Sequence, residues 1–556
     1  MQAKETSFLK FLRVPNQFRI PIFQRRYSWE EPHCEQLWQD VLRIGQNDET
    51  PSHFLGSIVY IEPDGSQNIS AVSELLVIDG QQRLTTLSLL LLALSRTIEK
   101  SGSEIGITPK QISNYYLFNA DEEGELRYRQ LLTYHDKDTL IQLLEDRELP
   151  SDASLRLVEN YRFFESKLQN TNLKLVYAGI QKLAIVDIAL DRRYDDPQLI
   201  FESLNSTGLS LSQADLIRNY VLMGQELDFQ TKLYNDHWLP MEQRFGDAYA
   251  EWFDWFIRDY LTVKRRQIPN INNVYETFKT HVPRQTTLEV LESTIAEIDQ
   301  YSKHYVKFAL LQEEDLDLRE CLKDIYELEA RVARPLLLEV YEDYTPGQIQ
   351  KPELIEILQL VESYVFRRAI CGIPTNTLNR VFESLMTRVD KSNYLRSLKD
   401  AFQQLTSTRR YPSDNEFKEA LFIKDVYNFS RRSYLLRKLE NHGREELISV
   451  EDYTIEHVMP QNPDMSESWQ QELGENWQEV QEKYLHTIGN LTLTGYNSKL
   501  SDRPFKEKQC ICGGFRDSPL RLNRSLAQTE QWNENNILAR AKELAEKALK
   551  IWISPE

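Results

Sequence analysis

Apolar residues in the first two hundred positions fall mainly in short runs of strand length. Three such runs are 54–61 (FLGSIVYI), 75–78 (LLVI) and 183–190 (LAIVDIAL). A leucine-rich segment over 84–100 has helical length and predicts a helix. A further helix is expected over 213–223, where Ser212 and Asp215 have the spacing of a capping box. This part of the chain mixes strand and helix signals.

The middle of the chain, about 231–430, is predicted to be helical almost throughout. Apolar residues recur at helical spacing in segments such as 354–369 and 415–438. Strand-like runs (DYTIEHVM and NLTLTGYN) return near the C-terminus, and a long amphipathic helix is expected over 533–552. The pattern predicts a helix-rich α+β multidomain protein, with β structure concentrated near its two ends.

Length and composition narrow the class of protein. A chain of 556 residues exceeds one ordinary domain, and about 150 residues per domain gives three or four units. No run of about 18 apolar residues occurs, and the first residues lack the apolar core of a signal peptide. The 5 cysteines do not suggest a disulfide framework. We therefore expect a reduced, cytoplasmic protein with no membrane association.

The net charge of -19 argues against a generally basic surface of the kind that binds nucleic acid. One stretch, 499–524, departs from this balance, since its seven basic and three acidic residues leave it at net +4. The basic residues are Lys499, Arg503, Lys506, Lys508, Arg516, Arg521 and Arg524. A solvated helix face would explain such a run, but its position beside the motif described next favours a DNA-contacting face.

A second pattern near the C-terminus carries chemistry. The segment YTIEHVMPQ predicts a strand that ends at Glu456 and His457, and GNLTLTGYN predicts a second strand followed by a helix through Lys508. His457, Asn490 and Asn497 then stand at the junctions of strand, loop and helix. Phosphodiester hydrolysis needs a base that works near neutral pH and a hard cation, and histidine with oxygen ligands supplies both. Oxygen ligands suit Mg²⁺ or Mn²⁺.

This order of elements resembles the HNH nucleases, whose ββα fold binds one divalent cation. The resemblance implies that His457 is the general base, that Glu456 and Asn497 supply oxygen ligands to the metal, and that Asn490 braces the loop. It leaves Lys499, Lys506 or Lys508 to hold the substrate phosphate. A lone histidine after an apolar strand is more often structural, but around His457 the whole string of motif residues is present. We interpret His486 as structural. Cys510 and Cys512 lack a second pair nearby, which argues against zinc.

Three segments of the N-terminal part suggest a phosphate site: 21–29 (PIFQRRYSW), 78–87 (IDGQQRLTTL) and 201–220 (FESLNSTGLSLSQADLIRNY). In the second, a strand runs through a glycine turn into a helix. Free amides at a helix N-terminus attract phosphate, and an arginine adds a bidentate fork. The expected ligand-binding residues are Gln24, Arg25, Arg26, Asp79, Gly80, Gln81, Gln82, Arg83, Asn205 and Thr207. The GxxxxGK[ST] sequence of ordinary P-loop enzymes does not occur. A hydrogen-bonded turn is the simpler interpretation of DGQQR alone.

Together the motifs resemble the GmrSD family of modification-dependent (type IV) restriction endonucleases. The resemblance implies a ParB/sulfiredoxin-like nucleotide-binding domain over 1–225, a helical linker or sensor region over 226–430, and an HNH-like nuclease domain over 431–556. It further implies a single chain that senses modified DNA, hydrolyses a nucleoside triphosphate (GTP or ATP) and cuts.

We therefore expect an NTP-dependent DNA endonuclease that acts in antiphage defence on base-modified or phosphorothioated DNA. One alternative is a ParB-like nucleotide-sensing regulator or adaptor that binds DNA and carries an inactive nuclease domain. Another is a nuclease that senses the nucleotide without hydrolysing it. The sequence leaves open which modification is read, and whether the chain forms a homo-oligomer.

Overall fold

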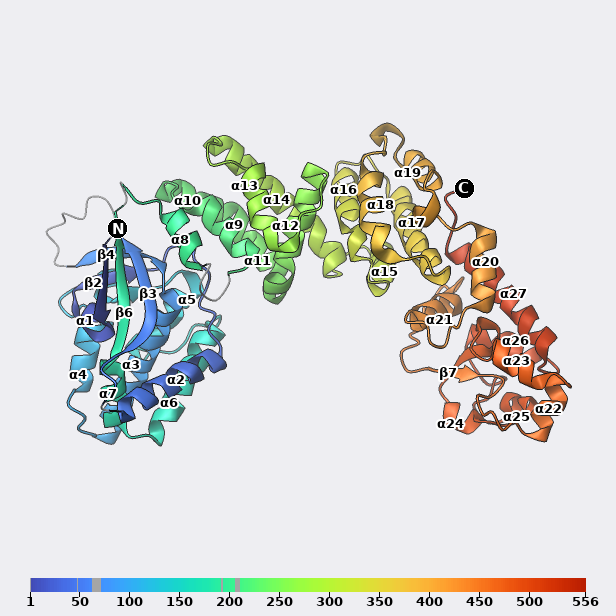
Figure 1. The fold of residues 1–556 in the computed structure, drawn as a ribbon, viewed down its shortest axis with the longest axis horizontal. Helices are drawn as coiled ribbons and strands as arrows, with labels where there is room; N and C mark the ends of the chain where they lie inside the picture. Colours follow the sequence, from blue (N-terminus) through green and yellow to red (C-terminus); the bar gives the residue numbers. More distant parts are fainter. Residues whose placement is uncertain (1, 48, 63–71, 192–193, 206–210) are drawn as a thin grey trace. The chain divides into compact units, whose positions relative to one another are not determined.

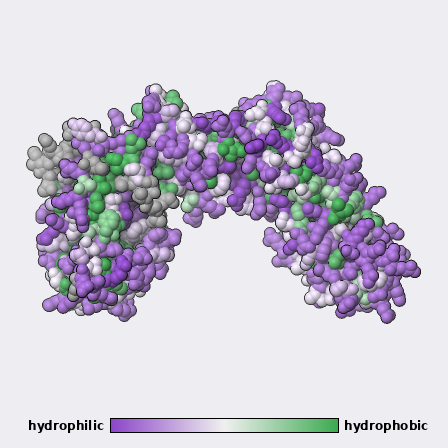
Figure 2. All heavy atoms as spheres, viewed as in Figure 1, coloured by the Kyte–Doolittle hydropathy of each residue, from purple (hydrophilic) through white to green (hydrophobic). Residues whose placement is uncertain are grey.

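The computed structural model describes residues 2–47, 49–62, 72–191, 194–205 and 211–556, and places them in two compact units (Figure 1). The first unit comprises Met1–Glu242 and Arg284–Ile295, and the second comprises Gln243–Pro283 and Ala296–Glu556. The fold is helix-rich α+β, as the apolar pattern predicts. No helix in the described ranges is long and apolar enough to cross a membrane. Hydrophilic residues cover most of the visible surface (Figure 2).

A six-stranded mixed sheet forms the centre of the first unit. Its strands lie in the order β1-β6-β3-β4-β2-β5. They are β1 (Gln2–Ser7), β2 (Asn16–Arg19), β3 (His53–Ile61), β4 (Ser73–Asp79), β5 (Gln130–Leu131) and β6 (Leu183–Leu190). The three predicted strands correspond to β3, β4 and β6. The apolar pattern does not predict the other three strands. Strand β1 is an exposed, polar edge strand, and β2 and β5 are only four and two residues long.

One long, buried helix packs among the other helices of this unit. Helix α3 (Gln81–Ser101) is buried along nearly its whole length, as expected for a helix that is apolar on most sides. The remaining helices are α1 (Phe8–Arg13), α2 (Glu31–Gln46), α4 (Pro109–Ile112), α5 (Tyr134–Glu145), α6 (Leu155–Gln169), α7 (Leu173–Gln181), α8 (Pro197–Asn205), α9 (Gln213–Leu222) and α10 (Leu227–Leu233). In α9, Ser212 caps the amide of Asp215 as its spacing predicted. The sheet and α3 therefore fix the β4–α3 turn, which carries the DGQQR segment.

The second unit begins as a stack of helices, which confirms the helical prediction for the middle of the chain. They include α12 (Tyr249–Arg265), α13 (Val274–His281), α15 (Leu316–Glu327), α16 (Arg334–Tyr344), α17 (Lys351–Ile370), α18 (Leu378–Met386) and α19 (Tyr394–Gln403). Helices α11 (Leu239–Phe245) and α14 (Leu288–Ala309) each span a boundary between the units.

The segment 415–438, which has helical apolar spacing, forms two helices, α20 (Asp414–Ile423) and α21 (Arg432–Asn441), with a loop between them. The carboxylate of Asp425 accepts a hydrogen bond from the backbone N of Asn428 (3.0 Å), which favours a turn over a continuous helix. The backbone N of Val426 donates to the carbonyl of His486 (2.8 Å). This α20–α21 loop is therefore tied to the C-terminal motif.

The C-terminal motif forms a two-stranded antiparallel sheet followed by short helices. Strand β7 (Thr454–His457) pairs with β8 (Leu491–Thr494), and Glu456 lies opposite Thr492. The insertion between them forms α22 (Glu467–Leu473) and α23 (Trp477–Tyr484). The helix predicted through Lys508 is two helices, α24 (Asn497–Leu500) and α25 (Phe505–Cys510), because Ser501 has a φ of 40° and Pro504 starts the next turn. The chain continues through α26 (Arg524–Gln528) to α27 (Glu534–Ile551), which confirms the predicted terminal helix.

Candidate functional site

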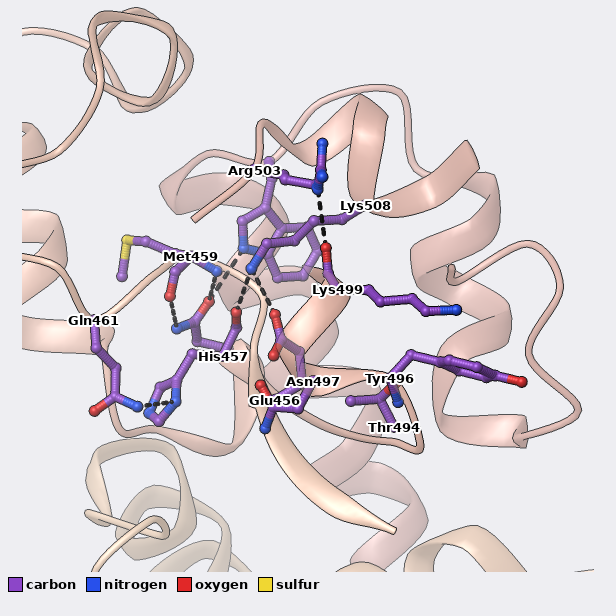
Figure 3. Close-up of polar contacts among 12 residues, drawn as sticks. Glu456, His457, Met459, Gln461, Thr494, Tyr496, Asn497, Lys499, Arg503 and Lys508 are labelled. Atoms are coloured by element: carbon purple, nitrogen blue, oxygen red, sulfur yellow. Dashed lines mark hydrogen bonds and ion pairs between the residues drawn. The ribbon is translucent and has the colours of Figure 1, made fainter. Parts of the chain in front are cut away.

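The end of β7 and the loop that follows it are held by the side chain of Asn490, which is fully buried. Its Oδ1 accepts hydrogen bonds from the backbone N of Met459 (2.8 Å) and from Nε1 of Trp532 (3.2 Å). Its Nδ2 donates to the carbonyls of Met459 (3.1 Å) and Leu485 (3.0 Å). Two of these four contacts hold Met459, two residues after His457, and the other two tie the same amide to Leu485 and Trp532. The side chain of His457 is shown in Figure 3.

Both ring nitrogens of His457 have a partner, and the partners indicate the tautomer. Nδ1 lies 2.9 Å from Nε2 of Gln461, and Nε2 lies 3.1 Å from Nδ1 of His486. Because an amide nitrogen only donates, Nδ1 of His457 accepts, and the ring proton is on Nε2, directed at His486. Gln461 is exposed. The atom of His457 that could take a proton is therefore hydrogen-bonded to a surface side chain.

His486 and Tyr427 complete the surroundings of His457. The ring of Tyr427 stacks on His486 with centroids 5.2 Å apart and an angle of 13° between the planes, and it meets His457 edge-on at 4.6 Å. The sequence pattern indicates only a structural role for His486 and gives no signal for Tyr427. A histidine four residues before Asn490 was the one available signal; the link to Tyr427 depends on the α20–α21 loop.

Burial keeps His457 neutral. Desolvation by burial, together with the charges of His486 and Lys508, lowers its pKa to about 3, and the carboxylate of Asp425 opposes the shift. The imidazole is therefore uncharged near neutral pH, and the lone pair on its Nδ1 accepts from Gln461, but the ring is a weak base in this environment. A nearby anion such as a phosphodiester would raise its pKa.

Glu456 and Lys508 form an enclosed ion pair beneath the site (Figure 3). Nζ of Lys508 lies 2.5 Å from Oε1 of Glu456 and 2.9 Å from the carbonyl of His457. Burial raises the pKa of Glu456 and lowers that of Lys508, while the attraction between them opposes both shifts. Lys508 was a candidate for holding the substrate phosphate, but the structure encloses it and directs it at Glu456 instead.

Two oxygens near the end of β7 have chemistry suited to a hard cation. Asn497 donates through Nδ2 to the carbonyl of Ile455 (2.9 Å) and to Oγ1 of Thr454 (3.3 Å), which leaves its Oδ1 without a partner among the described residues. Oε2 of Glu456 is likewise not hydrogen-bonded to any residue in the described ranges. In that part of the chain, no cluster of three or more His, Cys, Asp or Glu residues assembles a complete metal site. Since Mg²⁺ commonly takes one or two carboxylates and completes its shell with water and phosphate, one carboxylate and one amide oxygen fit it.

The basic stretch 499–524 lies largely on the surface. The exposed basic residues are Lys499, Arg503, Lys506, Arg516 and Arg524. Arg521 is half-buried and donates to the carbonyl of His442 (2.8 Å), and Lys508 is fully buried. In Figure 3 the side chains of Lys499 and Tyr496 extend away from the Glu456–Lys508 pair. Five of the seven basic residues can therefore contact a phosphate backbone.

In the first unit, the β4–α3 turn leaves backbone amides free at the start of a long helix. Gly80 caps α3 with a φ of 94°, and a Cβ at this position would lie 2.8 Å from the carbonyl oxygen of Ser57. Only glycine fits there. The amides of residues 81–83 have no hydrogen-bond acceptor in the described ranges, and no side chain caps the helix. This terminus can receive an anion.

Three glutamines expected to bind ligand instead join the two N-terminal motifs. Each donates from its side chain to a carbonyl of the other motif: Gln24 to Ile78 (2.7 Å), Gln81 to Arg25 (2.9 Å) and Gln82 to Arg26 (3.2 Å). Oε1 of Gln82 also accepts from the amides of Ser28 (2.9 Å) and Trp29 (3.3 Å). These contacts hold the 25–29 loop against the start of α3.

The arginines remain available for a ligand. Nη2 of Arg83 donates to the carbonyl of Ser57 (2.9 Å) and to Oδ2 of Asp79 (3.2 Å), whereas its buried Nε has no partner in the part of the chain that is described. The guanidinium groups of Arg25 and Arg26 form no hydrogen bond or ion pair with any described residue. Asn205 ends α8, but its side chain and the whole of Thr207 lie outside the described residues.

The comparisons with known proteins agree with this arrangement. A model of the GmrSD restriction endonuclease N-terminal domain matches residues 8–222, and a model of the GmrSD restriction endonuclease C-terminal domain matches residues 411–547. No curated protein matches the chain. The first match covers strands β2 to β6 of the sheet and the DGQQR turn, and the second covers the β7–β8 site together with the α20–α21 loop. The chain therefore belongs to the GmrSD family of type IV restriction endonucleases, and DNA is its substrate.

Proposed function

We propose that this protein cleaves modified DNA at the β7–β8 site, with His457 as the general base of an HNH-type centre, under the control of a nucleoside triphosphate bound at the start of α3. The observation that carries the proposal is the state of His457. The ring is neutral, its Nε2 is hydrogen-bonded to His486, and its Nδ1 lone pair accepts from the exposed side chain of Gln461.

The residues around His457 can each assist the transfer of a proton from an attacking water to its ring. Nδ1 of His457 accepts the proton once substrate displaces the Gln461 amide, and the Nε2 proton stays hydrogen-bonded to His486. The imidazolium that forms is stabilised by the charge of Asp425 and by the substrate phosphate. Asn490 keeps the ring in place by holding the following backbone.

Glu456 and Asn497 would hold Mg²⁺ or Mn²⁺, which when bound offsets negative charge on the phosphate and the leaving oxygen. Lys508 competes for Glu456, since its ammonium is already on Oε1. The exposed basic residues of 499–524 would contact the phosphates of the DNA backbone beside the β7–β8 site.

The start of α3 supports a nucleotide site. Free amides of residues 81–83 and the partly unpaired guanidinium of Arg83 suit phosphate groups of GTP or ATP, and Arg25 and Arg26 carry further unpaired charge. The glutamines that join the two motifs keep this loop close to the helix terminus.

A second candidate function is a nucleotide-sensing, DNA-binding regulator with an inactive nuclease centre. The pairing of Glu456 with Lys508 and the lowered pKa of His457 favour it, because both describe a centre that is not prepared for catalysis. Nicking of a modified plasmid, with and without chelator, distinguishes the two. Phosphate release from GTP or ATP by the same preparation distinguishes hydrolysis from sensing.

The proposal is tested by cleavage of matched DNA. Unmodified, hydroxymethylated, glucosylated and phosphorothioated substrates are compared with and without GTP or ATP, and wild-type protein is compared with His457→Ala. Cleavage of at least one modified substrate, dependent on His457 and stimulated by nucleotide, is the expected result. Cleavage that survives His457→Ala overturns the assignment of the base.

A further inference from the structure

A cavity of about 250 Å³ opens in the first unit beside Arg83. A single water needs only ~10–15 Å³ by such a measure, so this space is large enough for a ring-sized ligand. Its lining includes Trp29, His33, Asp40, Phe54, Arg83 and Leu87. These residues come from the 25–29 loop, α2, β3 and α3, the elements that surround the DGQQR turn. Arg83 belongs both to this cavity and to the proposed phosphate site.

Flat rings line part of the cavity. Trp29 and His33 stack on one another with centroids 5.8 Å apart and an angle of 21° between their planes. Phe54 is 59% exposed, although it is a large apolar side chain in a strand. Leu87 supplies a buried apolar surface. Aromatic side walls and an apolar floor suit a planar ring, because stacking on the aromatic side chains and removal from water both favour binding.

Polar groups in the same cavity lining would determine which hydrogen-bonding substituents a bound ring must have. The buried Nε of Arg83 has no hydrogen-bond partner among the described residues, so the guanidinium can still donate. The Asp40 carboxylate is held by Arg43 (2.7 Å) and Gln36 (3.2 Å) and is 18% exposed. A carboxylate accepts through several lone pairs, and it therefore favours a ring that bears N–H donors. A guanidinium, a carboxylate and stacked rings together match a nucleotide.

We propose that this cavity is the base pocket of the nucleotide site: the base stacks beside Trp29 and His33 and donates from its amino edge to Asp40, while the phosphates reach Arg83 and the free amides of α3. The inference rests on the proposed binding of nucleoside triphosphate at α3. It adds that the base contributes to binding through side chains outside the DGQQR segment.

Titration calorimetry on the full chain tests this, with GTP, ATP and inorganic triphosphate as probes. Trp29→Ala removes the stacking ring but keeps the backbone amide that donates to Gln82. We expect this variant to bind the preferred nucleotide about 5- to 150-fold more weakly, and to bind inorganic triphosphate within about twofold of wild type. Trp29→Phe should recover most of the loss. Arg83→Ala, in contrast, should weaken all the probes that wild type binds.

Each of the following outcomes would contradict the proposed base pocket. If Trp29→Ala binds nucleotide as wild type does, while Arg83→Ala does not, the base lies elsewhere and the proposed phosphate site survives. An equal loss of nucleotide and inorganic triphosphate means that Trp29 acts only by shaping the loop. Absence of nucleotide binding to wild type removes both proposals. A single-stranded oligonucleotide without a triphosphate that competes as strongly as GTP or ATP identifies a DNA base as the occupant. A thermal melt of each variant reports whether it is folded.

Discussion

Nζ of Lys508 lies 2.5 Å from Oε1 of Glu456, with 0% and 4% of the two side chains exposed. The pair joins α25 to the end of β7 across 52 residues of sequence. Removing one partner of a buried ion pair leaves an uncompensated charge, which typically costs about 3–5 kcal/mol. Each partner therefore compensates the buried charge of the other at the end of the strand that carries His457, and the pair at the same time occupies a proposed metal ligand.

Lys508→Met should destabilise the protein by about 3–5 kcal/mol, because Glu456 then loses its counter-charge. The double variant Lys508→Met with Glu456→Gln should recover part of that loss, since no buried charge remains. Urea unfolding of the second unit measures both. Arg503→Ala is the matched control, because its ion pair with Glu507 is about half exposed (51% and 52%), and little change is expected. Equal stability of Lys508→Met and wild type would contradict the buried pair.

His457→Ala should reduce DNA nicking by about 10²–10⁴-fold and leave nucleotide hydrolysis largely intact. The phosphate-binding groups belong to the first unit, whereas His457 belongs to the second. Nicking of a modified plasmid and phosphate release are measured on one preparation. Asn497→Ala should also lose nicking, with partial recovery in excess Mn²⁺. If His457→Ala lost both activities while folded, the two centres would be coupled more tightly than we propose.

His486→Leu should reduce nicking because Nε2 of His457 then loses its acceptor (3.1 Å) and the ring is no longer oriented. We expect about a tenfold or larger loss, as for a hydrogen bond to a group that becomes charged. His486→Gln offers a carbonyl acceptor and should retain more activity. Adding imidazole to His486→Ala should restore cleavage, whereas pyrrole, which has the same shape but no acceptor nitrogen, should not. Equal recovery with pyrrole would show that His486 only fills space.

Arg83→Ala should weaken nucleotide binding by about 1.5–3 kcal/mol, because it removes charge-assisted hydrogen bonds to phosphate. Arg83→Lys keeps the charge but loses the fork, so an intermediate affinity is expected. Calorimetric titration with GTP and ATP gives the affinities. Arg19→Ala is the matched control, since Arg19 is an arginine of the same unit that pairs with Glu74 (3.1 Å) and Glu125 (3.3 Å) and not with the DGQQR segment, and wild-type affinity is expected. Wild-type affinity in a folded Arg83→Ala protein would exclude this residue from the nucleotide site.

Lys499→Ala combined with Lys506→Ala should weaken DNA binding and reduce its salt dependence. Each phosphate contact that is lost lowers the slope of log affinity against log salt by about 0.9. Both residues are exposed, unlike Lys508. Fluorescence anisotropy at several salt concentrations measures the slope, and Lys542→Ala, an exposed residue on α27, is the control. An unchanged slope in the double variant would place the DNA face elsewhere.

The sequence by itself predicted the elements that carry the chemistry. Strands β3, β4, β6, β7 and β8, the long α3 helix and the terminal α27 helix follow from apolar runs and their spacing, which act over a few residues. The glycine turn before α3 was also readable, because only glycine adopts its backbone conformation without strain. The family could also be identified from the sequence, because DGQQR and EHVMPQ are short motifs of consecutive residues.

The partners of each side chain were decided only in the tertiary structure. Gln81 and Gln82 have the donors and acceptors of ligand-binding residues, but contacts across 56 residues direct them to the backbone of Arg25 and Arg26. Lys506 and Lys508 are the same residue type two positions apart, yet Lys508 is enclosed with Glu456 and Lys506 is exposed. The loop between α20 and α21 brings Tyr427 onto His486 and His457. Local spacing fixes which face of an element is buried, whereas burial, pKa and hydrogen bonding depend on segments that are distant in sequence and meet only when the chain folds.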